Sequence, residues 1–174
     1  MRTIGLGLMA LVLSACVLHE KTPLFSESDA VPILGSQKTV FAIYDRKDGA
    51  WVASDDPTFA ALPEGNHYLI PDPTTPDDLA SADRFDFIPL DAGHFAVQLR
   101  SDGEADYAIA TWDGTELLVR PLDCDALRSS GKATAIVAFE DDACTLHDST
   151  TSPRDLLAQL LPAAPEPTLR LVKQ

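Results

Sequence analysis

Histidine is the side chain that most often acts as a general acid, a general base or a metal ligand near neutral pH. The chain has four histidines: His19, His67, His94 and His147. No two of them have the i, i+2 or i, i+4 spacing that places two ligands on one face of a strand or a helix. His147 precedes Asp148, but adjacency in sequence does not by itself form a catalytic pair. We therefore predict no catalytic residue, metal or cofactor, and we retain His67, His94 and His147 as candidate surface contacts.

Residues 129–132, Ser-Ser-Gly-Lys, match the Ser-x-x-Lys pattern of some serine nucleophiles by residue type. That chemistry needs the serine and the lysine one helical turn apart, so that the amine can accept the hydroxyl proton. Gly131 weakens such a turn, and the companion motifs are missing, so we expect a turn before a strand. The acid-rich stretches 54–57, 72–78 and 140–143 lack the alternating acids and the glycine of a calcium loop, and we expect solvated turns there.

Two tryptophans, Trp51 and Trp112, border predicted hairpins. Their rings combine a large apolar face with one polar edge, a combination suited to contacts with a carbohydrate or a peptide. On strands, such rings more often fill the core or cover a sheet edge. We retain both residues as candidate surface contacts.

Hydrophobic residues alternate with polar ones along many short segments, which is the pattern of strands with one buried face. In residues 94–100, Phe95, Val97 and Leu99 fall on one face and the polar residues on the other. Asp-Gly and other glycine turns between the segments are typical of hairpins. The pattern predicts a mainly β protein, an antiparallel meander that forms a small barrel or sandwich. The predicted strands are residues 39–45, 50–54, 84–90, 94–100, 107–112, 115–120, 134–139, 143–147 and 168–173.

One segment near the C-terminus, residues 152–161, has the signature of a helix. Ser152 is suited to the N-cap, Pro153 to the first helical position, and Asp155 completes a capping box. Four leucines form an apolar stripe, so we expect this helix to cover an opening or a face of the β structure. Residues 122–131 predict a short helical turn, and residues 71–83, rich in Pro and Asp, a surface loop.

The N-terminus has a short positive start, an apolar run from Ile4 to Leu13, and small residues before Cys16, as in a secretory signal peptide. The run is too short for a membrane span, which needs about 20 residues. Leu13-Ser14-Ala15-Cys16 resembles the lipobox of bacterial lipoproteins. The resemblance implies cleavage before Cys16, acylation of Cys16, and a lipid anchor in the cell envelope. Val17 in place of Asp implies sorting to the outer membrane. We therefore expect a signal peptide at 1–15, a lipidated tether at 16–37 and one β-rich domain at 38–174.

If Cys16 carries lipid, Cys124 and Cys144 remain. The lipoprotein resemblance implies an oxidising compartment, where two cysteines are expected to form a disulfide. A zinc site is the alternative, but two cysteines twenty positions apart without a nearby ligand cluster make a poor one.

The formal net charge of −14 argues against nucleic acid as a partner, because such a surface repels phosphates. The sequence favours a non-catalytic, lipid-anchored binding or interaction module, which could hold a protein partner in the envelope. A second hypothesis is an inhibitor of a basic periplasmic enzyme such as lysozyme, although the Ser130-Gly131 segment lacks the tyrosine expected after it. A third is an envelope hydrolase or a small-ligand carrier. That hypothesis needs the histidines to converge with acids, or an apolar cavity inside a closed barrel.

Overall fold

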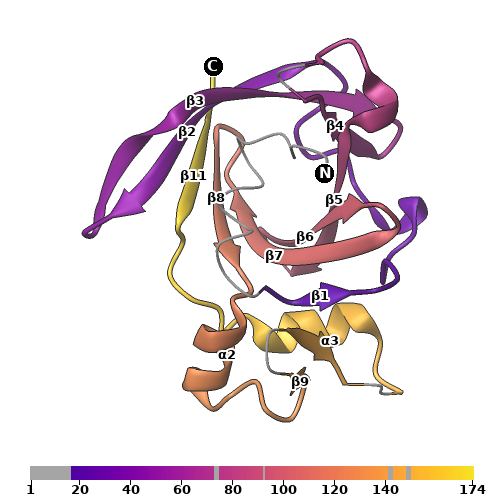
Figure 1. Cartoon of the computed structure of the whole chain (residues 1–174), viewed down its shortest axis with the longest axis vertical. Helices are drawn as coiled ribbons and strands as arrows, with labels where there is room; N and C mark the ends of the chain where they lie inside the picture. The colour runs from indigo at the N-terminus through magenta and orange to yellow at the C-terminus, as the bar shows by residue number, and fades with distance from the viewer. Residues whose placement is uncertain (1–16, 73–74, 92, 141–142, 148–149) are drawn as a thin grey trace.

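A closed antiparallel β-barrel of eight strands forms the body of the protein (Figure 1). The computed structural model describes residues 17–72, 75–91, 93–140, 143–147 and 150–174. Each barrel strand pairs with the next along the chain, and the last strand closes the ring by pairing with the first. The mainly β meander is therefore confirmed, and it forms a barrel. The strands are β2 (Thr39–Lys47), β3 (Ala50–Glu64), β4 (His67–Ile70), β5 (Asp83–Asp91), β6 (His94–Ser101), β7 (Glu104–Trp112), β8 (Glu116–Pro121) and β11 (Leu169–Lys173).

Hydrophobic side chains at alternate positions along the strands point into the barrel and fill its interior. On β2, Phe41 and Ile43 are buried, and they pair with Lys173 and Leu171 of β11. The register between β2 and β3 shifts next to Ile43, and beyond the shift this hairpin extends away from the body (Figure 1). Such an irregularity bends the bulged strand, which accounts for the divergence of the hairpin from the barrel wall.

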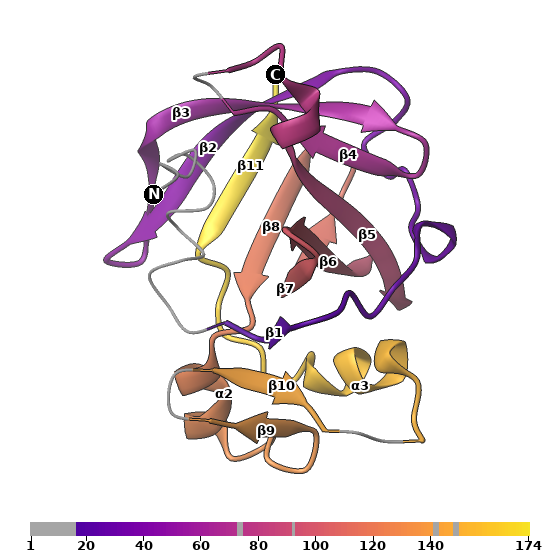
Figure 2. The same ribbon diagram turned by 45° about the vertical axis from the view of Figure 1, so that its right-hand side comes forward.

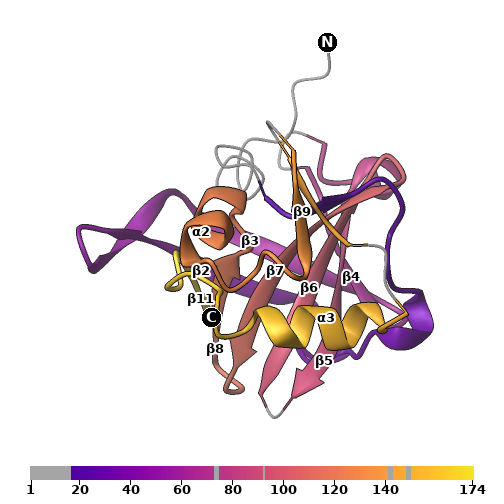
Figure 3. The ribbon, with the colours of Figure 1, turned by 90° about the horizontal axis from the view of Figure 1, so that it is seen from below.

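The connection from β8 to β11 forms a second layer outside the barrel: α2 (Cys124–Ser130), β9 (Val137–Phe139), β10 (Cys144–Leu146) and α3 (Pro153–Leu160) (Figures 2 and 3). Leu157 and Leu160 of α3 are fully buried in one cluster with Ile88 and Ala96 of the barrel wall. The N-cap and the first-turn proline predicted for α3 are confirmed, because the Asp155 N–H donates to the Ser152 hydroxyl at 3.2 Å and Pro153 begins the helix. The Asp155 carboxylate accepts the Ser152 hydroxyl at 2.8 Å. No helix among the described residues is long and apolar enough to cross a membrane.

The second layer buries the face of β6 that we expected to be exposed to solvent. The alternation of residues 94–100 predicted one buried and one polar face. In the structure, Ala96 and Gln98 on the outer face are also completely buried. The polar face is therefore not a solvated surface. Its polar groups bind other parts of the chain.

Residues 17–37 do not form the expected tether. β1 (His19–Glu20) pairs with the start of β7, and Leu18 and Phe25 are buried in the core between the barrel and the outer layer. A short 3-10 helix, η1 (Glu27–Asp29), follows, and Leu34 enters the barrel core. Apolar and polar residues follow one another in this segment without the regular spacing of a strand or a helix. The sequence of the segment therefore resembles that of a linker, although its apolar residues are buried. The predictions for residues 1–16, including the signal peptide and Cys16, lie outside the described residues.

A buried polar network fastens this segment to the barrel wall. Gln98 donates from Nε2 to the Phe25 carbonyl at 3.2 Å, and its Oε1 accepts the Phe25 N–H at 3.1 Å. The Tyr107 hydroxyl donates to the same Oε1 at 2.6 Å. Asp86 accepts from Gln98 at 2.9 Å and from Arg100 at 2.7 Å. Both the amide nitrogen and the amide oxygen of Gln98 therefore have hydrogen-bond partners. The N-terminal segment is an integral part of the fold.

Candidate functional site

The barrel interior retains an apolar cavity of about 70 Å³. Protein interiors are normally packed as densely as organic crystals, so a partly open void of this size in a small barrel is a feature to explain. The residues that line it come from every wall of the barrel: Leu34, Phe41, Phe59, Ile70, Phe85, Phe87, Val97, Leu99, Asp106, Tyr107, Ala108, Leu117, Val119, Leu169 and Leu171. Small side chains such as Ala108 leave space that the surrounding aromatic rings do not fill.

The N-terminal segment closes one end of the barrel. The Leu34 N–H donates to the Tyr68 hydroxyl at 2.9 Å, and this hydroxyl donates to the Gly35 carbonyl at 3.0 Å. Burial raises the pKa of Tyr68, so the phenol stays neutral and able to donate. The Val31 N–H donates to the Phe87 carbonyl at 2.9 Å. Phe87 lies on β5 just beyond the residues that pair with β4. Residues 31–35 therefore act as a fixed plug.

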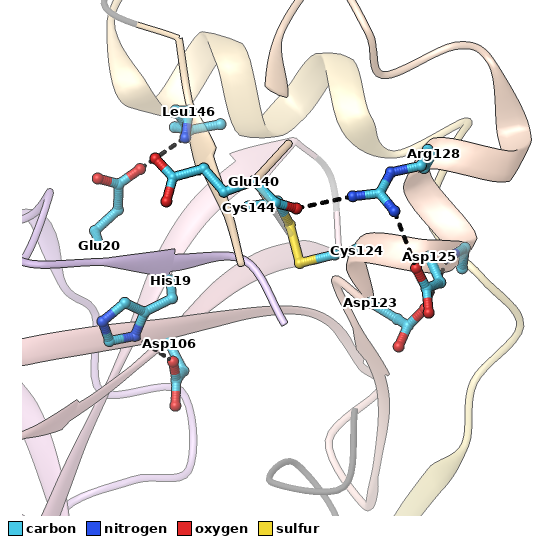
Figure 4. Close-up of a disulfide and its surroundings, with 11 residues drawn as sticks. His19, Glu20, Asp106, Asp123, Cys124, Asp125, Arg128, Glu140, Cys144 and Leu146 are labelled. Atoms are coloured by element: carbon cyan, nitrogen blue, oxygen red, sulfur yellow. Dashed lines mark hydrogen bonds and ion pairs between the residues drawn. A yellow bond between two sulfur atoms is a disulfide. The ribbon is translucent and has the colours of Figure 1, made fainter. Parts of the chain in front are cut away.

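A carboxylate and a histidine lie at the opposite end. Asp106 lines the cavity, and its Oδ1 lies 2.8 Å from Nδ1 of His19 on β1 (Figure 4). Nε2 of His19 lies 3.5 Å from Glu104. The side chains of His19 and Asp106 remain 34% and 20% exposed, so this end of the lumen is in contact with solvent. We call it the mouth of the cavity.

Two further carboxylates belong to the inward side of strands at the mouth. Asp45 follows Phe41 and Ile43 on the inward face of β2. Its residue is only 8% exposed, and among the described residues its buried Oδ1 has no hydrogen-bond partner. Asp83 follows the same alternation as Phe85 on β5. Burial raises the pKa of Asp83, and the charges of Asp72 and Asp102 raise it further.

The three histidines chosen from the sequence do not converge. His67 is 3% exposed on β4, with Nε2 2.7 Å from Glu64, so it is not the surface contact that we expected. His94 begins β6, and its Nδ1 lies 2.5 Å from Asp91. His147 is exposed after β10. Asp148, its neighbour in sequence, lies outside the described residues.

The tryptophans and the Ser-x-x-Lys segment have structural surroundings. Trp51 lies near the tip of the β2–β3 hairpin, with the Arg46 guanidinium 6.0 Å from its ring centroid. Trp112 packs edge-to-face on Phe41 at 6.3 Å, which makes it largely a core residue. The segment 129–132 ends α2, and Gly131 adopts the left-handed C-cap conformation at φ 66°, so the expected turn is confirmed.

The two remaining cysteines form the expected disulfide. Cys124 begins α2 and Cys144 begins β10, with 5.7 Å between their Cα atoms (Figure 4). Both residues are buried in the core between the barrel and the outer layer. The bond therefore stabilises the outer layer beside β1, because Leu18, the residue before His19, bridges to Cys144.

No protein-family model, curated protein or solved structure matches this chain. Within the ranges that the structure describes, no three His, Cys, Asp or Glu side chains are grouped so as to hold a metal ion. The candidate site is therefore the cavity and its mouth. No pattern in the sequence singled out His19 or Asp106 as a site residue. Alternation along β7, in which Asp106, Ala108 and Ala110 share a face, was the signal that could have placed a carboxylate inside the barrel.

Proposed function

We propose that this protein is a non-catalytic, lipid-anchored binding protein of the bacterial cell envelope that holds a small apolar ligand in its barrel. The apolar cavity is the observation that carries the proposal. An eight-stranded barrel is just wide enough either to be filled by side chains or to hold one small ligand. Here the side chains leave about 70 Å³ unfilled. The separation of His67, His94 and His147 supports binding over hydrolysis.

The lipobox supports the location of this function. Acylation of Cys16 would place lipid directly before Val17, which is buried and bridges to Asp123. The barrel would then lie close to the membrane, because no flexible tether separates it from the anchor. Metabolic labelling with a fatty acid tests the anchor. Cys16→Ser should abolish labelling and leave an unprocessed precursor, and labelling that persists in this variant would refute it.

Calorimetric titration with 1-octanol tests the cavity. The protein would be purified into phospholipid nanodiscs, and the heat of titrating empty nanodiscs would be subtracted. Wild type should bind one molecule. Ala108→Leu, which fills the void from β7, should abolish binding while circular dichroism stays unchanged. Failure of the wild type to bind 1-octanol and other eight-carbon probes would overturn the proposal.

A protein partner and inhibition of a basic enzyme stay predictions. The net charge of −14 supports electrostatic attraction to a basic protein. A lysozyme activity assay at micromolar protein measures the second of these directly, and unchanged lysozyme activity would remove it.

A further inference from the structure

We propose that the mouth of the cavity selects ligands with a protonated amine, so that the preferred ligand is an apolar amine with its alkyl part inside the barrel. This inference rests on the proposed function, and it adds the chemical class of the ligand. Its basis is the position of three carboxylates relative to the cavity wall.

Each of the three carboxylates lies directly across a strand pair from a residue that lines the cavity. Asp45 is opposite Leu169, Asp83 is opposite Ile70, and Asp106 is opposite Leu99. Directly opposed residues of an antiparallel pair point to the same side of the sheet. The three acids therefore belong to the lumen side of three different strand pairings around one opening, and they are not part of the solvated outer surface.

Asp106 is the carboxylate that an amine can reach from within the cavity, because it lines the cavity itself. Its Oδ1 is engaged by His19 at 2.8 Å, and among the described residues Oδ2 has no hydrogen-bond partner. An ammonium group placed at Oδ2 would leave the His19 contact intact. The apolar wall on the other side of the head group lowers the local dielectric and strengthens this attraction.

Asp45 supplies an independent reason to expect a cation. A buried carboxylate is costly unless a donor or a cation compensates it. Asp45 is only 8% exposed, and its Oδ1 has no hydrogen-bond partner among the described residues. A bound amine would bring positive charge to this end of the lumen. The same charges would repel a fatty-acid carboxylate.

Three probes with the same eight-carbon chain separate the possibilities: octylamine, 1-octanol and octanoate. They would be titrated at pH 7 into the full chain in nanodiscs, with empty nanodiscs as the reference. Octylamine should bind at least about tenfold more tightly than 1-octanol, as expected for a charged hydrogen bond. Octanoate should bind more weakly than 1-octanol. Across shorter amines, affinity should rise about fourfold per methylene until the cavity is full.

Asp106→Asn should reduce the preference for octylamine over 1-octanol toward parity. Asp113→Asn is the matched control, since it removes the same charge from an exposed turn at the other end of the barrel, and it should keep the preference. If Asp106→Asn does not fold, Asp83→Asn provides a second comparison, because it removes another carboxylate from the lumen side of the mouth and should also reduce the preference for octylamine. Equal binding of octylamine and 1-octanol by the wild type would overturn this inference and leave the proposed function standing. Absence of binding by all three probes would overturn the proposed function.

Discussion

Replacing Gln98 by Leu is expected to detach the N-terminal segment from the barrel. Gln98 is completely buried, and leucine is close to it in volume but carries no polar group. The substitution leaves two buried donors without an acceptor, the Phe25 N–H and the Tyr107 hydroxyl. The Phe25 carbonyl and Asp86 keep their bonds from Arg100, so they remain satisfied.

The magnitude follows from the two orphaned donors. Each costs about 1–3 kcal/mol when buried without a partner, which predicts a loss of about 2–6 kcal/mol in the free energy of unfolding. A domain of this kind is stabilised by only about 5–15 kcal/mol in total. The loss of Gln98→Leu is concentrated where the N-terminal segment contacts the barrel wall, so we expect residues around Phe25 to detach before the barrel unfolds.

Urea unfolding measures the total loss, and amide hydrogen exchange locates it. In Gln98→Leu, the Phe25 amide should exchange rapidly, while amides in β6 and β7 stay protected. Gln159→Leu is the control, because it makes the same chemical change at an exposed position of α3 and should alter stability by less than about 0.5 kcal/mol. A loss below about 0.5 kcal/mol for Gln98→Leu, with the Phe25 amide still protected, would refute the structural role given to the network.

Three further predictions concern pH and the disulfide. Burial raises the pKa of Tyr107 well above its ordinary value near 10, so the wild type should lose stability above about pH 10 relative to Tyr107→Phe in urea titrations across pH 9–11. The raised pKa of Asp83 means that its charged form opposes folding. Asp83→Asn should therefore melt at a higher temperature than the wild type at pH 7, and the gain should vanish below about pH 4. Replacing Cys124 and Cys144 by Ala should cost about 3 kcal/mol in urea unfolding, and an unchanged midpoint would show that the covering layer does not need the bond.

The barrel was accessible to sequence analysis because its strands have one buried face and end at glycine or Asp-Gly turns. Phe95, Val97 and Leu99 alternate cleanly and do pack against the barrel core, where Val97 and Leu99 line the cavity. β4 was missed, since it has only four residues, three of them buried in succession. β1 was missed because a strand of two residues is too short to show an alternating pattern. It forms only by pairing with β7, which is distant in sequence.

The candidate site was less accessible than the fold. A cavity depends on the volumes of side chains from all strands together, which no local pattern contains. The mouth depends on His19, from a segment that resembles a linker, meeting Asp106 across 87 positions. The histidines that did stand out are bound to their own neighbours, His67 to Glu64 and His94 to Asp91, so their residue type alone was a poor guide.

Two buried carboxylates, Asp86 and Asp45, differ in whether a cation compensates them. Asp86 is completely buried, and its charge is compensated by Arg100 at 2.7 Å and by Arg84 at 3.8 Å, so the fold depends on it. Asp45 is nearly as buried but lacks such a cation among the described residues. A closed barrel needs only an apolar residue there, as at Phe41 and Ile43 on the same face. Positions that break the local rules of a fold without a compensating partner concentrate at functional sites. The unpartnered Oδ1 of Asp45 is therefore better explained by the proposed amine ligand at the mouth than by any requirement of the barrel.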